Sequence, residues 1–336
     1  MNILSVPDLL SNGRISRALA DVERDLTRAS EELTTGRKTD LVAATNGDPT
    51  RLFAIERDIS LNESRRTSID LAVGRSTVAQ ASLAQVQNAV ADFGPRLAAA
   101  TSVRDIGAAE RIAAEARDAF SQAVAALNSR FGDRSVFAGA AADGPALADA
   151  EDILADVAAA AAAATDPADA IAAVESYFND PGGFDATGYL GSVDDVEAAE
   201  IGPGERLDYA VRGDRRELRD ALSALAIAVV GVEGGFPGDT IDGRLDVLEA
   251  SALRSVSAEA GVIELRSELG VAEERLEQAT VRASAEDAFL QTARNRIVER
   301  DQFQAATEFT ALETQLQTIF SVTARLSNLT LTNFLR

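Results

Sequence analysis

Residues 262–283 read VIELRSELGVAEERLEQATVRA and carry the most regular pattern in the chain. Apolar residues recur there at alternating steps of three and four, at Val262, Leu265, Leu269, Ala272, Leu276, Ala279 and Ala283. Such a heptad seam is typical of a long helix that packs lengthwise against another helix. Long paired helices are therefore predicted to dominate this fold.

The same spacing recurs at both ends of the chain, in helices predicted over residues 15–35 and beyond residue 302. Little neighbouring sequence is available at either end to form a private core, so these helices are predicted to meet each other or other subunits. The predicted assembly interface comprises Leu19, Val22, Leu26, Leu33, Phe309, Leu312, Leu316, Ile319, Leu326 and Leu329.

A further long helix is predicted over residues 50–93, before the helix breaker Gly94-Pro95. Polar residues occupy seam positions in its middle, at Asn62 and Arg66, so the register is expected to drift there. A third, alanine-rich helix is predicted over residues 104–130.

The middle of the chain, residues 131–239, has a different character because glycine and proline become frequent. The alanine tract 157–164 is typical of a short helix, and residues 193–212 alternate around the turn 202–204, which indicates a β-hairpin. A helix is predicted again over residues 216–230.

This order of elements predicts a mainly α fold, namely a long antiparallel helical rod with paired N- and C-terminal helices and a small irregular α+β middle domain. Three domains are predicted: a terminal coiled coil of residues 1–45 with 300–336, a helical rod of residues 46–135 with 240–299, and a middle domain of residues 136–239.

The composition argues against catalysis and against nucleic acid. The chain has no cysteine and no histidine, which removes disulfides, thiolate chemistry, the commonest general base and the commonest metal ligand. The side chains still available for catalysis are carboxylates, serines, tyrosines and the single lysine, Lys38. A net charge of −22 repels nucleic acid and anionic membranes. No catalytic residue, cofactor or metal site is predicted.

Two local patterns that could carry chemistry are incomplete. Residues 239–249 loosely suggest a calcium-binding loop, but Gly238 and Thr240 stand where the first two ligands would be needed. Lys38-Thr39 lacks the upstream glycines of a phosphate-binding loop. Both stretches are interpreted as structural.

No apolar run approaches the length of about 20 residues that a membrane-spanning helix requires, and the N-terminus lacks the features of a cleaved signal peptide. If the protein is secreted, it is therefore expected to leave the cell without a cleaved signal.

Three segments resemble the bacterial flagellin superfamily. Residues 19–60, LADVERDLTRASEELTTGRKTDLVAATNGDPTRLFAIERDIS, are similar to its N-terminal pattern of an amphipathic helix, an LTTGRK element and a turn that opens a long helix. The turn Gly47-Asp48-Pro49-Thr50, the element SVFAG at 135–139 and the C-terminus SVTARLSNLTLTNFLR at 321–336 resemble the hook–filament junction proteins (hook-associated protein 3) more than flagellin.

The resemblance implies a structural subunit of the bacterial flagellum that joins hook and filament, with an axial terminal domain and a variable outer middle domain. It implies as partners copies of the same chain, the neighbouring hook-associated protein and flagellin, and an export chaperone. It also implies an extracellular location reached through the flagellar export apparatus.

Three alternatives remain open beside this interpretation. A flagellin filament subunit would use the same terminal helices, and only the turn, the SVFAG element and the C-terminus distinguish it. A secreted elongated coiled-coil binding protein, such as an adhesin or a toxin accessory, would instead be a stable monomer with ordered ends. An enzyme is the third reading, which a carboxylate cluster in one pocket would revive.

Overall fold

The computed structural model describes the backbone of residues 5–334 and the side chains of residues 13–325. The chain divides into two compact units. The first comprises Met1–Glu63 and Ala285–Arg336, and the second comprises Ser64–Ser284. The two division points fall inside the two longest helices, α3 (Thr50–Ala91) and α11 (Ile241–Val298), so each of these helices contributes residues to both units.

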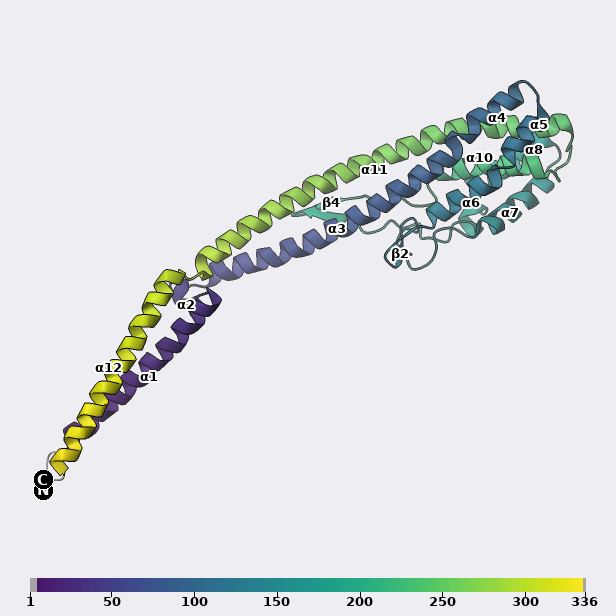
Figure 1. Ribbon diagram of the computed structural model, residues 1–336. Helices are drawn as coiled ribbons and strands as arrows, with labels where there is room; N and C mark the ends of the chain where they lie inside the picture. Colours follow the sequence, from purple (N-terminus) through teal and green to yellow (C-terminus); the bar gives the residue numbers. More distant parts are fainter. Residues whose placement is uncertain (1–4, 335–336) are drawn as a thin grey trace. The chain divides into compact units, whose positions relative to one another are not determined.

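The first unit contains the chain ends. Besides its parts of α3 and α11, it consists of α1 (Ser5–Thr35), the short α2 (Leu41–Ala44) and α12 (Gln302–Phe334). α1 and α12 pack lengthwise against each other (Figure 1). Where α3 and α11 run through this unit, Ile55 and Ile59 are buried together with Leu290.

The second unit contains the remaining elements, most of them short. They are α4 (Phe93–Ser102), α5 (Ile106–Ala113), α6 (Ala116–Leu127), β1 (Arg130–Phe131), β2 (Arg134–Ser135), α7 (Ala150–Ala162), α8 (Pro167–Asn179), α9 (Phe184–Thr187), β3 (Ala199–Gly202), β4 (Glu205–Leu207) and α10 (Arg216–Glu233). Its strands form two antiparallel hairpins, β1–β2 and β3–β4.

Within the second unit, α3 and α11 run side by side in opposite directions (Figure 1). All seven residues of the predicted seam between 262 and 283 are buried. Two hydrogen bonds between polar residues fix the register of α3 against α11. The Gln80 side-chain nitrogen donates to the Arg266 carbonyl at 3.1 Å, and Arg266 Nε donates to the Gln80 side-chain oxygen at 2.9 Å. The heptad periodicity therefore predicted a real helix–helix contact.

The seam of α3 changes phase where polar residues interrupt it. Buried positions advance by alternating threes and fours through 52, 55, 59 and 62, and again from Ile69 through 72, 76, 79, 83, 86 and 90. The two stretches are offset by three residues, which is the kind of insertion that locally overwinds a coiled coil. The predicted register drift near Asn62 and Arg66 is thus confirmed, and Asn62 itself is fully buried.

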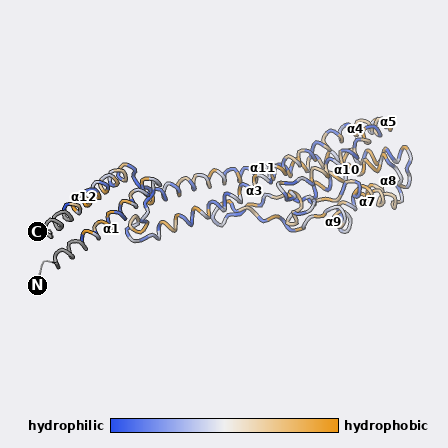
Figure 2. The backbone as a smooth tube through the Cα atoms, turned by 60° about the horizontal axis from the view of Figure 1, so that its bottom comes forward, coloured by the Kyte–Doolittle hydropathy of each residue, from blue (hydrophilic) through white to orange (hydrophobic). Residues whose placement is uncertain are grey.

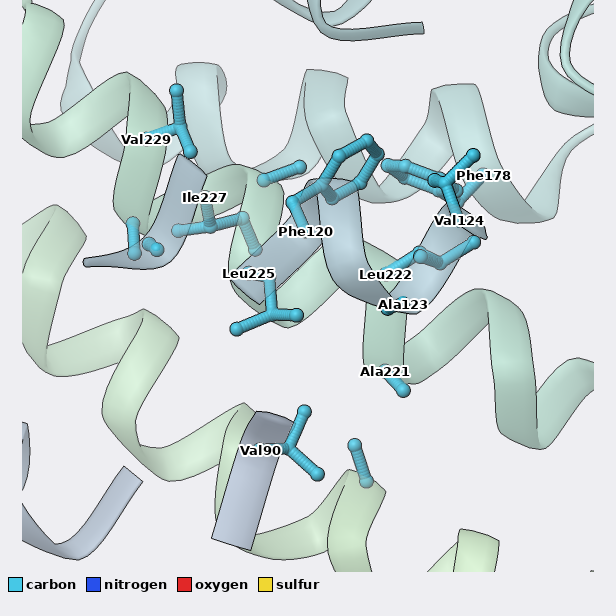
Figure 3. Packing of buried hydrophobic residues seen from close by; sticks show 14 of the residues in the cluster. Val90, Phe120, Ala123, Val124, Phe178, Ala221, Leu222, Leu225, Ile227 and Val229 are labelled. Carbon is cyan, nitrogen blue, oxygen red and sulfur yellow. The ribbon is translucent and has the colours of Figure 1, made fainter. Parts of the chain in front are cut away.

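The largest core lies where α6, α7, α8 and α10 pack beside the ends of α3 and α11. Figure 3 shows Phe120 and Val124 of α6 against Leu222 and Leu225 of α10, with Phe178 of α8 close by. Apolar residues are frequent along these helices in the hydropathy view (Figure 2). This core accounts for the long buried face of α10, whose residues 221–231 are all buried.

The SVFAG element at residues 135–139 connects the loops of the second unit through burial of Phe137 and hydrogen bonds to its carbonyl. The Phe137 ring is fully buried, and its carbonyl accepts hydrogen bonds from the Gly213 N–H at 2.8 Å and the Tyr189 hydroxyl at 3.3 Å. Gly139 has a φ of 59°, and a Cβ there would lie 2.6 Å from the carbonyl oxygens of Ser192 and Asp194. Glycine is therefore required by both backbone conformation and space.

The β3–β4 hairpin packs on the α3–α11 pair, with Ile201, Leu207 and Tyr209 buried against Ile69 and Leu276. It confirms the hairpin predicted around the turn 202–204. The helix predicted over residues 104–130 is instead divided into α5 and α6. Ala114 and Glu115, which lie between α5 and α6, keep helical dihedral angles. The interruption of the helix is therefore small, and the amino-acid composition does not reveal it.

The predicted mainly α fold, with long helices, paired terminal helices and a small irregular α+β region, is confirmed. None of the described helices is both long and apolar enough to cross a membrane.

Candidate functional site: the paired terminal helices

The terminal helices begin and end where their local sequence dictates. α1 ends at Thr35 because Gly36 follows with a φ of 66°, a left-handed conformation that glycine adopts at little cost. α12 begins after Asp301, whose carboxylate accepts the Gln304 N–H at 2.9 Å as an N-terminal cap. Both helices are long, and orange and blue residues alternate along them in Figure 2.

The predicted interface residues lie along both of these helices. Val22 is buried at 5% exposure, and Leu19, Leu26, Leu33, Phe309, Leu312, Leu316 and Ile319 are half-buried. Leu326 and Leu329 lie outside the residues whose side chains the structure describes. Ala29 and Ala305 are buried as well, which sequence reasoning left out of the interface.

One seam residue out of eight described is buried in a single chain, so the two helices cover each other incompletely. Phe303, Phe320 and Val322 of α12 add exposed apolar surface, at 81%, 51% and 45% exposure. Covering the exposed apolar surface of this amphipathic helix pair with another protein surface would lower the free energy.

At one end, the two helices are held together by contacts that we call the terminal clasp, formed by Glu32, Gly36, Lys38, Thr39, Ile297, Val298 and Arg300. The Gly36 N–H donates to the Glu32 carbonyl at 2.9 Å, and the Arg300 N–H donates to the Gly36 carbonyl at 3.0 Å. The LTTGRK element therefore ends α1 and binds the segment that precedes α12.

Lys38 caps the C-terminal end of α11. Its Nζ donates to the Ile297 carbonyl at 3.1 Å, and its backbone N–H donates to the Val298 carbonyl at 2.8 Å. A cation at this position is favoured by the unsatisfied carbonyls of the last helical turn and by the helix dipole. The only lysine of the chain thus has a structural explanation that involves no phosphate.

Glu32 is the electrostatic centre of the clasp. The residue is 8% exposed, and its Oε2 lies 3.2 Å from Arg300 Nε. Its Oε1 accepts the N–H and the hydroxyl of Thr39 at 3.1 and 3.2 Å. Arg300 also pairs with Glu308 of α12. A carboxylate can remain buried when a cation and donors satisfy it, so this pair links α1 to α12.

Sequence reasoning missed the clasp, because Glu32 and Arg300 are far apart in the chain. A signal was nevertheless present. Glu32 directly precedes the seam residue Leu33, and acidic side chains are rarely buried without a partner. The segment 36–39 contains the hydrogen-bond donors that a buried carboxylate needs.

Replacing Arg300 by methionine is expected to loosen the terminal helices, because Glu32 would keep its burial and lose its cation. Removing one partner of a buried polar pair costs about 1–3 kcal/mol. Amide hydrogen exchange in α1 and the first turns of α12 should accelerate on the order of tenfold. Arg296→Met, an exposed position on α11, is the matched control.

Adding Glu32→Gln to Arg300→Met should restore part of the protection, since the orphaned charge is then removed. Equal exchange rates in Arg300→Met and Arg296→Met would contradict a stabilising role for the pair.

The turn at 46–50 positions the start of α3. Asn46 and Gly47 have φ angles of 53° and 85°, and the Asp48 carboxylate accepts the Thr50 N–H at 3.0 Å. Hydrogen bonds from the Thr50 side chain and backbone hold the pKa of Asp48 below its ordinary value. The turn therefore places two left-handed residues in succession and ends with a side-chain hydrogen bond to the first residue of α3.

Among the described residues, no group of three or more acidic, histidine or cysteine side chains is placed to hold a metal ion. At the rejected calcium-loop stretch, Asp239 forms an ion pair with Arg244 at 2.5 Å, which lowers the pKa of Asp239. The arrangement at the chain ends is one of packing and electrostatic pairing.

Comparison with known proteins agrees with this architecture. Residues 256–335 match the family model for the bacterial flagellin C-terminal helical region. The fold is similar to the crystal structure of FlgL from Bacillus cereus, with a TM-score of 0.51 and 15% identity over 72% of this chain and 100% of that one.

A second similar structure is a putative flagellar hook-associated protein from Vibrio parahaemolyticus, with a TM-score of 0.50 and 13% identity over 74% of this chain and 98% of that one. No curated protein sequence matches the chain.

The expected resemblance to the flagellin superfamily is confirmed, in sequence over residues 256–335 and in fold over most of the chain. The fold is therefore flagellin-like, and residues 256–335 carry the sequence features of the C-terminal helical region of bacterial flagellin. Two of the structures that share this fold are FlgL and a putative hook-associated protein, which is the group that the turn at 47–50 and the C-terminus resemble.

Proposed function

We propose that this chain is a non-enzymatic structural subunit that joins the hook and the filament of the bacterial flagellum and assembles through its terminal helices. The observation that carries the proposal is the incompletely covered α1–α12 pair, whose predicted interface residues remain half-buried in a single chain. Burying these seams between neighbouring subunits would supply the free energy of assembly.

The proposed partners are further copies of the chain, the adjacent hook-associated protein and flagellin, with an export chaperone that covers the terminal helices before assembly. The proposed location is the extracellular flagellum, reached without a cleaved signal peptide. Residues 1–45 with 300–336 would form the axial domain, residues 46–135 with 240–299 the helical rod, and residues 136–239 the outer domain.

A flagellin filament subunit is the second candidate, because its assembly would use the same terminal helices. The Gly47–Thr50 turn and the C-terminal segment 321–336 favour the junction role. A stand-alone coiled-coil binding protein is disfavoured by the half-buried seams, which would leave a permanent monomer with costly exposed apolar surface.

Deleting the gene tests the junction role. Cells without it are expected to keep hooks, to lose filaments and to release flagellin monomers into the medium, because filament subunits would have no surface on which to polymerise. Electron microscopy of the cells and analysis of the culture supernatant measure both effects, and a plasmid copy of the gene is the control.

Intact filaments in the deletion strain would exclude the junction role. Hooks without any flagellin in the medium would instead identify the chain as the filament subunit itself.

A further inference from the structure

The α3–α11 pair of the second unit is covered on one flank and open on the other. The β3–β4 hairpin covers the first flank, where Ile201, Leu207 and Tyr209 are buried against the two helices (Figure 1). The open flank at the same level contains a groove of about 460 Å³. Its lining residues all belong to α3 and α11, namely Val73, Thr77, Glu273, Leu276, Glu277, Thr280 and Val281. We call it the α3–α11 groove.

The interior of the groove is apolar. Leu276 is fully buried beneath it, and Val73 and Val281 at its sides are 37% and 65% exposed. The Thr77 hydroxyl donates to the Val73 carbonyl and the Thr280 hydroxyl donates to the Leu276 carbonyl, each at 2.9 Å. Both hydroxyls are thus satisfied within their own helices. An apolar side chain can therefore enter the groove without leaving either hydroxyl unpaired.

The shape of the groove suits a third helix. Val73 and Thr77 lie one turn apart on α3, and Leu276 and Thr280 lie one turn apart on α11. Four residues at this spacing form the kind of hole that receives an apolar side chain of a packed helix. The volume and the apolar interior are also those of a typical binding pocket.

The covered flank shows how this helix pair selects the charge of what packs on it. Around α11, Arg282 lies on the hairpin side of the seam and pairs with Glu205 of the hairpin at 4.0 Å. On α3, Arg65 likewise pairs with Glu200 of the hairpin at 3.8 Å. On this flank the helices therefore supply the cations and the covering segment supplies the anions.

The charges on the open flank are reversed. Glu273 and Glu277 border the groove one turn apart on α11, and among the described residues no cation pairs with either carboxylate. Glu273 has only a long hydrogen bond from Gln80 Nε2, at 3.5 Å. Like charges at this spacing destabilise a helix, so a cation placed between them is stabilising. A complementary cover for this flank must therefore be basic.

From these observations we infer that the α3–α11 groove is a docking site for a basic amphipathic helix of another protein. An apolar side chain of that helix enters between Thr77 and Thr280, and its lysine or arginine side chains pair with Glu273 and Glu277. Charge distinguishes this occupant from a second copy, because two chains that each carry −22 repel one another. The site is separate from the terminal helices and goes beyond the proposed junction role.

The size of the groove indicates a reversible contact. Residues 273–281 span about 12 Å of helix at 1.5 Å of rise per residue. A contact of this length covers far less than the roughly 800 Å² per partner of a stable interface. The occupant is therefore expected to bind and leave rather than to become a permanent part of the assembly.

Binding of designed peptides to the full-length chain tests the inference. The probe is a dye-labelled helical peptide with leucines along one face and lysines beside them, and its binding is followed by fluorescence anisotropy. Replacing its leucines by alanine, with every lysine kept, is expected to raise the Kd at least tenfold, because the apolar side chain is lost from the groove.

The matched pair of protein variants locates the peptide. Glu273→Gln combined with Glu277→Gln is expected to raise the Kd about three- to tenfold at low salt, since two exposed ion pairs are lost. Glu264→Gln combined with Glu274→Gln removes the same charge from exposed positions of α11 outside the groove and should leave the Kd within about twofold of the wild type. Circular dichroism checks that both variants are folded.

Three results of the peptide experiment would overturn the inference. Equal affinity of the two double variants would mean that the peptide responds only to the overall negative charge. Equal affinity of the leucine and alanine peptides would mean that the apolar interior is not used. The absence of binding at millimolar peptide would mean that the groove does not accept a basic helix.

A photocrosslinking residue at Thr77 identifies the occupant in living cells. The inference is supported by adducts with another protein that join it at a segment with alternating basic and apolar residues and that decrease in the Glu273→Gln, Glu277→Gln chain. Adducts between two copies of this chain, or no adduct at all, would overturn it. None of these outcomes depends on whether filaments persist in the deletion strain, so the junction role stands or falls separately.

Discussion

Leu316→Asp is expected to abolish incorporation of the chain into flagella while the melting temperature of the monomer stays within about 2 °C of the wild type. Leu316 is half-buried on α12, so its burial is incomplete in a single chain. The main core lies elsewhere, in the second unit. Full burial of an exposed leucine is worth roughly 1.5–3 kcal/mol, and assembly would supply the part that the single chain leaves uncovered.

The aspartate would lose that free energy and would also place an unpaired charge in an apolar contact, which is far more costly. The two penalties recur in every copy, so assembly should fail outright. Gln315→Asp introduces the same charge at the neighbouring exposed position and is the matched control. Incorporation is measured by the amount of chain in sheared flagella, and monomer stability by thermal unfolding followed by circular dichroism.

Two outcomes would contradict this expectation. Normal incorporation of the Leu316→Asp chain would mean that residue 316 does not enter a buried contact. A clearly lower monomer melting temperature would mean that α12 mainly completes the subunit's own core.

Phe137→Ala is expected to have the largest effect on stability. The ring is fully buried in the second unit, and removing a buried phenylalanine costs about 3–5 kcal/mol through lost burial and the cavity left behind. For a unit of this size, each kcal/mol lowers the melting temperature by about 2–4 °C, so a decrease of about 6–20 °C should follow.

Phe289→Ala is the matched control, because this ring on α11 is 71% exposed. Calorimetry of both variants measures the difference. If the melting temperature of Phe137→Ala fell by less than about 3 °C, the SVFAG element would not be the main stabilising contact of these loops.

Much of the architecture is determined by local sequence. The seam from Val262 to Ala283 predicted the buried face of α11 residue by residue, because the position of a side chain around a helix depends only on spacing along the chain. Gly36 and the turn at Gly202–Gly204 likewise predicted a helix end and a hairpin, since both depend on backbone conformations of a few adjacent residues.

The sequence was less informative where the outcome depended on two distant segments. Burial of Glu32 follows from Arg300, and no periodicity pairs a carboxylate near the N-terminus with a guanidinium near the C-terminus. The division between α5 and α6 was missed for a related reason, because alanine-rich sequence is compatible with one helix or two and packing decides between them.

The sequence alone therefore determined which residues form long helices, which face of each helix is apolar, and that the two chain ends match in character. The tertiary structure decided which apolar residues are covered within one chain. The seam of α11 is buried and the seams of α1 and α12 are half-covered, whereas Leu253, Val256 and Ile263 of α11 are exposed. The physical reason is that amphipathicity is a property of one segment, whereas burial is a relation between segments that only the folded chain brings together.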